Sequence, residues 1–503
     1  MSTPHASPPL VDDIFRYRYQ HGTNVGPIFM HGPWLDNDAF EMNLNSTREL
    51  EEIKRSIETK GLDETRSDWE SHWRTALTDD DLVWLRTVAK CNSIRLPVGF
   101  FTFGPVFCMG TPFEGEPSQV YNNCWNTVRH LLRKCYDHGI GVLIDFQTIP
   151  GRSQGRDRTG SNETTVDACP SSSNWSLARD CVAFIVQEVT FHAMSEVIGV
   201  QISSDTDWKT CDLEKWYDEV FEIASSINPS LPMFISDGGD LSAALDLAMS
   251  KNQFPTRVGR SPIVVDTHRY YTAGKYRSMD PLSVIQQIPS ELAELETRQK
   301  NVVAQGTAVD VYVGEYSCAM HPQSWSCAKA SEYPSLMRTF GQAQGKQWAS
   351  KACGSAFCGF KMHGLGGDAW KLEQQVDAGN ISAPVWLALP QTRIQKLLQQ
   401  AEAQREHVRG GSLSHESSLL SSSECHHYEV GWDTGFRDAL TFFGAVSHGI
   451  IPGSGEGGDT IGALELWIRK RISRTNSLDK QLGMAWEKGL RKGVDDFYKI
   501  VGI

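Results

Sequence analysis

Eight short runs of β-forming residues recur along the chain and constrain its fold more than any other feature. They lie at 23–29, 93–98, 141–146, 197–203, 233–236, 263–268, 311–316 and 356–361. Most of them are continuously apolar rather than alternating, a pattern typical of parallel strands that are buried on both faces. Because segments with helical periodicity separate the runs, the sequence predicts a (β/α)8 TIM barrel of the α/β class.

The helical segments between the runs carry recognisable stop signals. The segment at 124–139 spaces its apolar residues three and four apart and ends in Gly139, a residue typical of helix C-caps. The segment at 213–229 repeats this spacing and ends at Pro229, which cannot continue a helix. Both segments are therefore expected to be outer helices of the barrel.

The composition of the chain divides it into four parts. Residues 1–17 are rich in proline and serine and are expected to form a flexible N-terminus. Residues 18–406 hold the eight runs and form the predicted barrel. Residues 407–426 are rich in serine and glycine and are expected to be a disordered surface loop. Residues 427–503 are expected to be extra helices that pack on the barrel.

The charge balance and the cysteines bear on partners and location. The 503 residues carry a net charge of −13, which argues against nucleic acids and anionic membranes as partners. We find no secretory signal at the N-terminus and no run of 18 apolar residues that could span a membrane. The twelve cysteines include no CxxC pair, so free thiols in a reducing cytoplasm are expected. The oligomeric state is left open.

Polar residues follow most of the eight runs or lie near their ends. Active sites of (β/α)8 barrels lie at the carboxyl ends of the strands, so these residues are expected to converge on one rim. In "VYVGEYSCAM" the seventh run leads into Glu315, which either lies where the strand reaches the protein surface or is a catalytic residue. Because polar residues at the ends of several runs are expected on the same rim, a catalytic role is favoured. The rim residues are Arg95, Asp145, Gln147, Ser204, Asp205, Asp207, Asp237, His268, Tyr270, Glu315, Cys358 and Lys361.

Structural roles stay open for several of these residues. Arg95 could be a buried partner that holds one carboxylate in place. His268 could be a hydrogen-bonded core histidine, and Asp145 could cap a helix. Lys361 is more typical of a surface residue or of a residue in a salt bridge.

Several motifs together resemble glycoside hydrolase family 5, and within it the fungal exo-β-1,3-glucanase type with its intracellular members. They are "YQHGTNVGPIFMHGPWL", "CNSIRLPVGFF", "GVLIDFQTIPG", "VDTHRYY", "VYVGEYSCAM" and "HHYEVGWDTGFRDAL". The resemblance runs from about residue 18 to the C-terminal helices. It implies a (β/α)8 barrel and a retaining mechanism, in which two carboxyl groups about 5 Å apart act as nucleophile and acid/base.

The resemblance also implies roles for individual residues. Glu315 matches the nucleophile at the end of the seventh strand of the family. Arg95 matches an arginine that orients and ionises this nucleophile. His268 and Tyr270 match the family's "HxY" motif.

The sequence departs from the family pattern at four places. The Asn-Glu pair that carries the acid/base at the fourth strand is replaced by Ser204-Asp205. Gln147 replaces a histidine after the third strand, and Cys358 replaces a tryptophan of the eighth. Gly32 stands where the family has a glutamate. Because Asp is shorter than Glu by roughly 1.5 Å, and a displacement of about 1 Å can cost a hundredfold in rate, an efficient β-glucosidase is hard to reconcile with these changes.

Three hypotheses about function remain. The first is a repurposed enzyme that uses the Glu315 carboxylate on a small ligand other than an ordinary β-glucan. The second is an intracellular exo-β-1,3-glucosidase with Asp205 as acid/base, and the third is a non-catalytic binding protein. Under the first two, Glu315 and Asp205 are catalytic, and the ligand, a small molecule or glycoside, is bound by Arg95, Gln147, Ser204, His268, Tyr270 and Cys358.

The sequence indicates no cofactor and no metal site. Cys425, His426 and His427 lie together, but no further ligand group has the spacing of a zinc site.

Overall fold

The structure is a computed structural model. It describes residues 7–26, 28–30, 46–148, 170–204, 206–254, 259–361, 367–416, 419–453, 456–474 and 479–503.

Eight parallel strands form a closed barrel in which each strand pairs with the next and β8 pairs with β1. The predicted (β/α)8 barrel is therefore confirmed. Most strand positions agree with the sequence pattern, but β1 begins three residues earlier than its apolar run because polar residues of β1 are also buried. The strands are β1 (Gln20–Val25), β2 (Ser93–Gly99), β3 (Gly141–Thr148), β4 (Val197–Gln201), β5 (Met233–Ser236), β6 (Ile263–Tyr271), β7 (Val311–Met320) and β8 (Gly354–Phe360).

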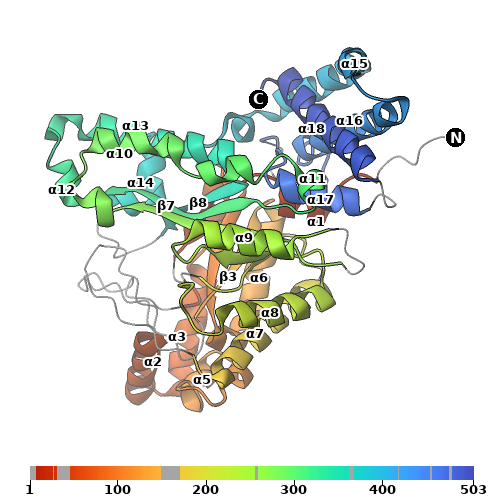
Figure 1. Ribbon diagram of the computed structural model, residues 1–503. Coiled ribbons are helices and arrows are strands. Elements are labelled where there is room, and N and C mark those ends of the chain that lie inside the picture. The colour runs from red at the N-terminus through yellow and green to blue at the C-terminus, as the bar shows by residue number, and fades with distance from the viewer. Residues whose placement is uncertain are drawn as a thin grey trace.

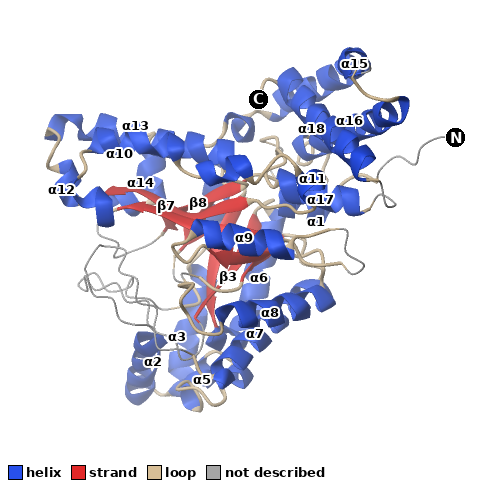
Figure 2. Ribbon diagram, viewed as in Figure 1, coloured by secondary structure: helices blue, strands red, loops and turns tan. Residues whose placement is uncertain are grey.

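Helices surround the strands, as Figures 1 and 2 show. Their buried faces pack against the barrel through one large apolar cluster. The helices up to β8 are α1 (Val11–Tyr17), α2 (Ser46–Lys60), α3 (Leu62–Thr75), α4 (Asp79–Thr87), α5 (Glu116–Val120), α6 (Cys124–Asp137), α7 (Ser172–Phe191), α8 (Leu213–Ile227), α9 (Leu241–Lys251), α10 (Pro281–Gln287), α11 (Val302–Gln305), α12 (Pro322–Trp325) and α13 (Tyr333–Lys351). After β8 come α14 (Leu372–Asp377), α15 (Gln391–Glu416), α16 (Ser422–Phe443), α17 (Leu464–Ser473) and α18 (Lys480–Val501).

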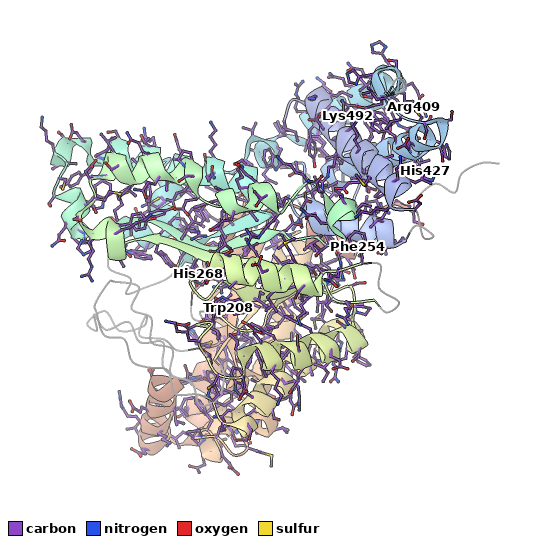
Figure 3. All side chains as sticks on the ribbon, in the orientation of Figure 1. Trp208, Phe254, His268, Arg409, His427 and Lys492 are labelled. Carbon is purple, nitrogen blue, oxygen red and sulfur yellow. The ribbon has the colours of Figure 1, made fainter. Side chains whose placement is uncertain are left out.

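The C-terminal helices lie against the amino-terminal ends of the strands. Asp310, just before β7, accepts a hydrogen bond from the backbone N–H of Leu466 in α17 at 2.9 Å. Glu487 of α18 accepts the backbone N–H groups of Val302 and Val303 at the start of α11. Figure 3 places Lys492 and Arg409 in this helical group and His268 at the opposite end of the barrel. The C-terminal helices therefore support the barrel from the end that faces away from His268.

Four glycines bring the backbones of α16 and α18 into direct contact. A Cβ atom on Gly489 would lie 2.0 Å from the carbonyl oxygen of Tyr428, and one on Gly493 would lie 2.1 Å from that of Trp432. Gly431 and Gly435 of α16 meet backbone carbonyls of α18 at similar distances. Because these neighbours are backbone atoms, a side chain at any of the four positions must push the helices apart.

We expect Gly489→Ala to lower the free energy of unfolding by about 1–3 kcal/mol, the usual cost of overpacking a core. The matched control is Gly411→Ala in α15, where a Cβ meets no atom within 4 Å. Since alanine is the better helix former, the control is expected to gain up to about 1 kcal/mol. Denaturant unfolding of both variants measures the difference, and equal stabilities would contradict the close packing of α16 on α18.

Two expected disordered segments are corrected by the structure. Residues 11–17 of the expected flexible N-terminus form α1, in which Ile14 and Phe15 are fully buried. In the expected loop at 407–426, residues 407–416 continue α15 and residues 422–426 begin α16. Ser412 donates a hydrogen bond to Asp496 of α18, and Ser421 caps α16. Tertiary contacts and capping thus overcome the weak helix propensity of glycine and serine.

The cysteines correct one further expectation. The described cysteines are free thiols, most of them buried, except Cys211, which is disulfide-bonded. The prediction of free thiols is therefore wrong at Cys211. Within the described ranges, no helix combines the length and the apolar character that crossing a bilayer requires.

Candidate active site

Glu315 lies inside β7, and its carboxylate is held on both oxygens. Arg95 donates from Nη1 to Oε1 of Glu315 at 2.7 Å. Tyr270 donates its hydroxyl to Oε2 at 2.5 Å. Glu315 thus contacts both Arg95 and Tyr270, two of the residues expected to converge on this rim. β7 does not end at Glu315, however, but continues to Met320.

Arg95, which is fully buried on β2, joins four strands of the barrel. Besides Glu315, its guanidinium donates to Asn24 Oδ1 of β1 at 3.0 Å and to Asp266 Oδ2 of β6 at 3.4 Å. Its Nη2 also lies 3.2 Å from Asp145 Oδ2 of β3. One guanidinium therefore faces three carboxyl groups. Arg95 is thus not the partner of a single carboxylate, and Asp145 lies within β3 and does not cap a helix.

Asp145 is the carboxyl group of this cluster whose pKa is shifted most clearly. Its complete burial raises the pKa of its carboxyl group to about 7, because the charged form is poorly solvated there. The guanidinium of Arg95 acts in the opposite direction and lowers this pKa, whereas the negative charges of Glu315 and Asp266 raise it. The cluster therefore holds a proton close to neutral pH.

His268 connects two of the carboxylates. Its Nε2 lies 3.3 Å from Asp266 Oδ2 and its Nδ1 lies 3.6 Å from Glu315 Oε2. The side chain is 13% exposed, so it reaches the surface of the site while Asp266 stays buried. His268 is consequently part of the polar cluster and not an isolated core histidine.

The packing of Asp266 explains why a glycine, Gly314, precedes Glu315. A Cβ atom at this position would lie 2.0 Å from Asp266 Oδ1. Because Asp266 is held by Arg95 and His268, it has little room to move. The absence of a side chain at 314 thus allows the Asp266 carboxyl to pack against the strand that carries Glu315.

Three other expected site residues, Ser204, Gln147 and Cys358, contact members of this cluster. Ser204, just after β4, accepts a hydrogen bond from Arg95 Nη2 at 3.0 Å. Gln147 of β3 donates to Asp145 Oδ2 at 2.7 Å. Cys358 of β8 is buried in a small cluster with Trp370 and the ring of Tyr270. Asp205, the expected acid/base, and Gly32 lie outside the described residues.

Lys361 and Asp237 lie apart from the cluster in their contacts. Lys361, which follows β8, forms a salt bridge with Asp81 at 2.5 Å, the structural role that the sequence left open for it. Asp237, after β5, accepts a hydrogen bond from the Thr267 hydroxyl and from the backbone N–H of Gly239. Both contacts are structural.

Two residues of the cluster were missed by sequence reasoning. Asn24 accepts from Arg95 and donates to the backbone oxygen of Gly314 at 2.9 Å, so it ties β1 to β7. Asp266 is two residues before His268 on the same strand. Because side chains of a strand alternate between faces, residues i and i+2 share a face, and the "DTH" spacing could have placed Asp266 in the site.

Comparisons with known proteins indicate what this arrangement is similar to. Residues 395–501 match the family model described as glucan 1,3-beta-glucosidase 3 C-terminal domain. The chain is 26% identical over 482 residues to glucan 1,3-beta-glucosidase 3 of Schizosaccharomyces pombe, and the match covers 94% of each chain. It is 21% identical to an uncharacterized glycosyl hydrolase of Saccharomyces cerevisiae, covering 97% of this chain and 92% of the relative.

A solved structure supports the fold. The rutinosidase from Aspergillus niger superposes with a TM-score of 0.52 and 14% sequence identity, over 73% of this chain and 98% of that one. At this identity the likeness concerns the barrel alone.

Proposed function

We propose, on the premise that this chain is a relative of the fungal exo-glucanase-like proteins of glycoside hydrolase family 5, that Glu315 is the reacting carboxylate of a glycosidase-type enzyme. Its ligand is a small glycoside or a molecule of similar shape, and hydrolysis of ordinary β-glucans is weak. The observation that carries the proposal is that Arg95 and Tyr270 donate hydrogen bonds to the two oxygens of Glu315, at 2.7 and 2.5 Å.

These two hydrogen bonds are what a nucleophilic carboxylate requires. A carboxylate that attacks the anomeric carbon of a sugar must be ionised and must point in a fixed direction. The guanidinium of Arg95 favours the ionised form, and the two hydrogen bonds fix both oxygens. Burial of Arg95 and Glu315 keeps water from screening the interaction.

The acid side of the reaction is the reason to expect weak β-glucan hydrolysis. A retaining glycosidase needs a second carboxyl group that protonates the leaving oxygen. The sequence offers Ser204-Asp205 where the family has Asn-Glu, and Ser204 is engaged with Arg95. We therefore propose that the natural ligand releases its leaving group with little acid assistance.

A second candidate is an exo-β-1,3-glucosidase in which Asp205 acts as acid/base. The similarity to glucan 1,3-beta-glucosidase 3 along 94% of the chain favours it. The two candidates differ in their requirement for acid catalysis, and rates on good and poor leaving groups separate them.

The test compares a nitrophenyl β-glucoside with laminari-oligosaccharides. We expect the wild-type protein to cleave the activated glycoside measurably, and the oligosaccharides far below the ordinary enzyme rate of about 10 per second. Ser204→Asn combined with Asp205→Glu is expected to raise the oligosaccharide rate by about ten- to a hundredfold, since it restores the reach of the acid. Asp205→Glu alone serves as the control for side-chain length.

Each other outcome selects a different function. Ordinary rates on laminari-oligosaccharides in the wild type would establish the exo-β-1,3-glucosidase. Absence of turnover on both substrates, together with binding of either one, would establish a non-catalytic binding protein.

A further inference from the structure

The guanidinium of Arg95 faces more acceptors than its terminal nitrogens can serve. Nη1 and Nη2 carry two hydrogens each. Nη1 donates to Glu315 and Asn24, which uses both of its hydrogens. Nη2 has Ser204 Oγ at 3.0 Å, Asp145 Oδ2 at 3.2 Å and Asp266 Oδ2 at 3.4 Å. Three acceptors therefore compete for two hydrogens.

Asp145 is the carboxyl group that this competition leaves with the weakest support. Glu315 receives Arg95 and Tyr270, and Asp266 receives Arg95 together with His268. Asp145 has the same guanidinium at 3.2 Å, and it receives the neutral amide of Gln147 at 2.7 Å where Asp266 has the imidazole of His268. The second oxygens of Asp145 and Asp266, Oδ1 in each, are both buried without a hydrogen bond from the described residues. A buried carboxylate oxygen without a donor is costly, and a proton on the carboxyl group removes that cost.

The negative charges around Asp145 act in the same direction, and the guanidinium of Arg95 opposes them. Arg95 on β2 faces it, as do Asp266 on β6 and Glu315 on β7, and His268 on β6 contacts the last two. On β3 and β4 the neighbours are the neutral side chains of Gln147 and Ser204. With one guanidinium against three carboxyl groups, a proton on one of them brings the cluster closer to neutrality.

We infer that Asp145 is a positioning residue that carries the proton of this cluster and thereby leaves Arg95 to Glu315 and Asp266. The inference rests on the proposed function, in which Glu315 is the reacting carboxylate. When Asp145 loses its proton, its charge competes for Nη2 of Arg95 and adds repulsion beside Glu315. Arg95 then moves toward β3, and Glu315 loses the direction that its reaction requires.

This role predicts a pH limit for the site. The burial that raises the pKa of Asp145 to about 7 places the loss of its proton in the neutral range. Activity on a nitrophenyl β-glucoside should therefore fall above about pH 7, and in Asp145→Asn this fall should be absent, because asparagine cannot ionise. A purely structural role of Asp145 would lower the rate at every pH without changing the shape of the profile.

Direct titration tests the inference without any need for turnover. Carbon-13 NMR of protein labelled at the aspartate carboxyl carbons should show a group that titrates near pH 7 in the wild type and is missing in Asp145→Asn. Burial also raises the pKa of Asp310 to about 8 and that of Asp438 to about 6, so these two transitions should remain in the variant. Asp266→Asn and Glu315→Gln are matched variants that each remove one negative charge near Asp145. Both should move the transition of Asp145 to lower pH. These two variants therefore test the assignment even if Asp145→Asn does not fold.

The outcomes separate this inference from the proposed function. A variant Asp145→Asn that retains every aspartate transition of the wild type above about pH 5 would overturn it, because Asp310 and Asp438 alone would then account for those transitions. An unchanged pH profile in Asp145→Asn would overturn the positioning role as well. If no glycoside is turned over at any pH, the proposed function fails, and the titration still decides whether Asp145 holds the proton.

Discussion

Arg95→Met is expected to lower the free energy of unfolding by about 3–5 kcal/mol at neutral pH, the usual cost of removing one partner from a buried ion pair. The variant fills the space of the side chain but leaves Glu315, Asp145 and Asp266 without the guanidinium that contacts all three. Denaturant unfolding monitored by tryptophan fluorescence measures the change.

The loss of stability should depend on pH in a defined direction. Arg95 lowers the pKa of Asp145, so its removal raises this pKa further above the value of about 3.9 in an unfolded chain. A carboxyl group whose pKa is raised by folding costs nothing below its unfolded value, and its cost grows as the pH rises toward its folded value. The difference between Arg95→Met and the wild type should therefore be smaller near pH 4 than near pH 8.

Arg95→Lys is the matched control for this variant. Lysine retains the positive charge but lacks the planar fork that reaches β1, β6 and β7 together. We expect it to recover part of the stability and little of the activity. Equal stability of Arg95→Met and the wild type at pH 8 would show that the three carboxyl groups do not depend on the guanidinium.

The barrel could be predicted because its strands obey a simple rule. Buried parallel strands are apolar along their length, and most of the eight runs show this pattern. β1, with the sequence "QHGTNV", is buried throughout although most of its residues are polar. Thr23 and Asn24 donate hydrogen bonds to backbone oxygens of β8 and β7, and a hydrophobic pattern cannot reveal such partners.

The site could be predicted in part for a similar reason. Glu315, Arg95 and Tyr270 were expected together because each lies on a different strand near the same rim. The competition of Asp145 and Asp266 for Arg95 was not foreseen, because it depends on distances across the barrel interior. The spacing of Asp145 to Gln147 and of Asp266 to His268, two residues in each case, was the available signal.

The C-terminal helices show the limit of local propensity. Serine and glycine at 407–416 favour a loop when considered alone. In the structure Arg409 pairs with Glu429 of α16, and Ser412 donates to Asp496 of α18, so contacts with distant segments keep the helix formed. The family model that matches residues 395–501 is consistent with one unit formed by these helices.

Glu315→Gln is expected to abolish glycoside cleavage, with a loss of at least about a thousandfold, because the amide cannot act as the nucleophile. Its effect on stability is expected to be small, within about 1 kcal/mol, since Arg95 keeps the Asp266 carboxylate as a charged partner. This combination distinguishes a functional carboxylate from a structural one. If Glu315 served only as a partner of Arg95, the same substitution would cost stability and change no activity.

The assignment of Glu315 as the reacting carboxylate is tested most directly by covalent capture. A 2-deoxy-2-fluoro-β-glucoside with a good leaving group forms a slowly hydrolysed glycosyl ester on a retaining nucleophile and needs little acid assistance. Mass spectrometry of digested protein should find the fluoroglucosyl mass on the peptide that contains Glu315 in the wild type, and no labelled peptide in Glu315→Gln. A label on another residue, or an unlabelled wild type alongside a strongly destabilised Glu315→Gln, would contradict the assignment.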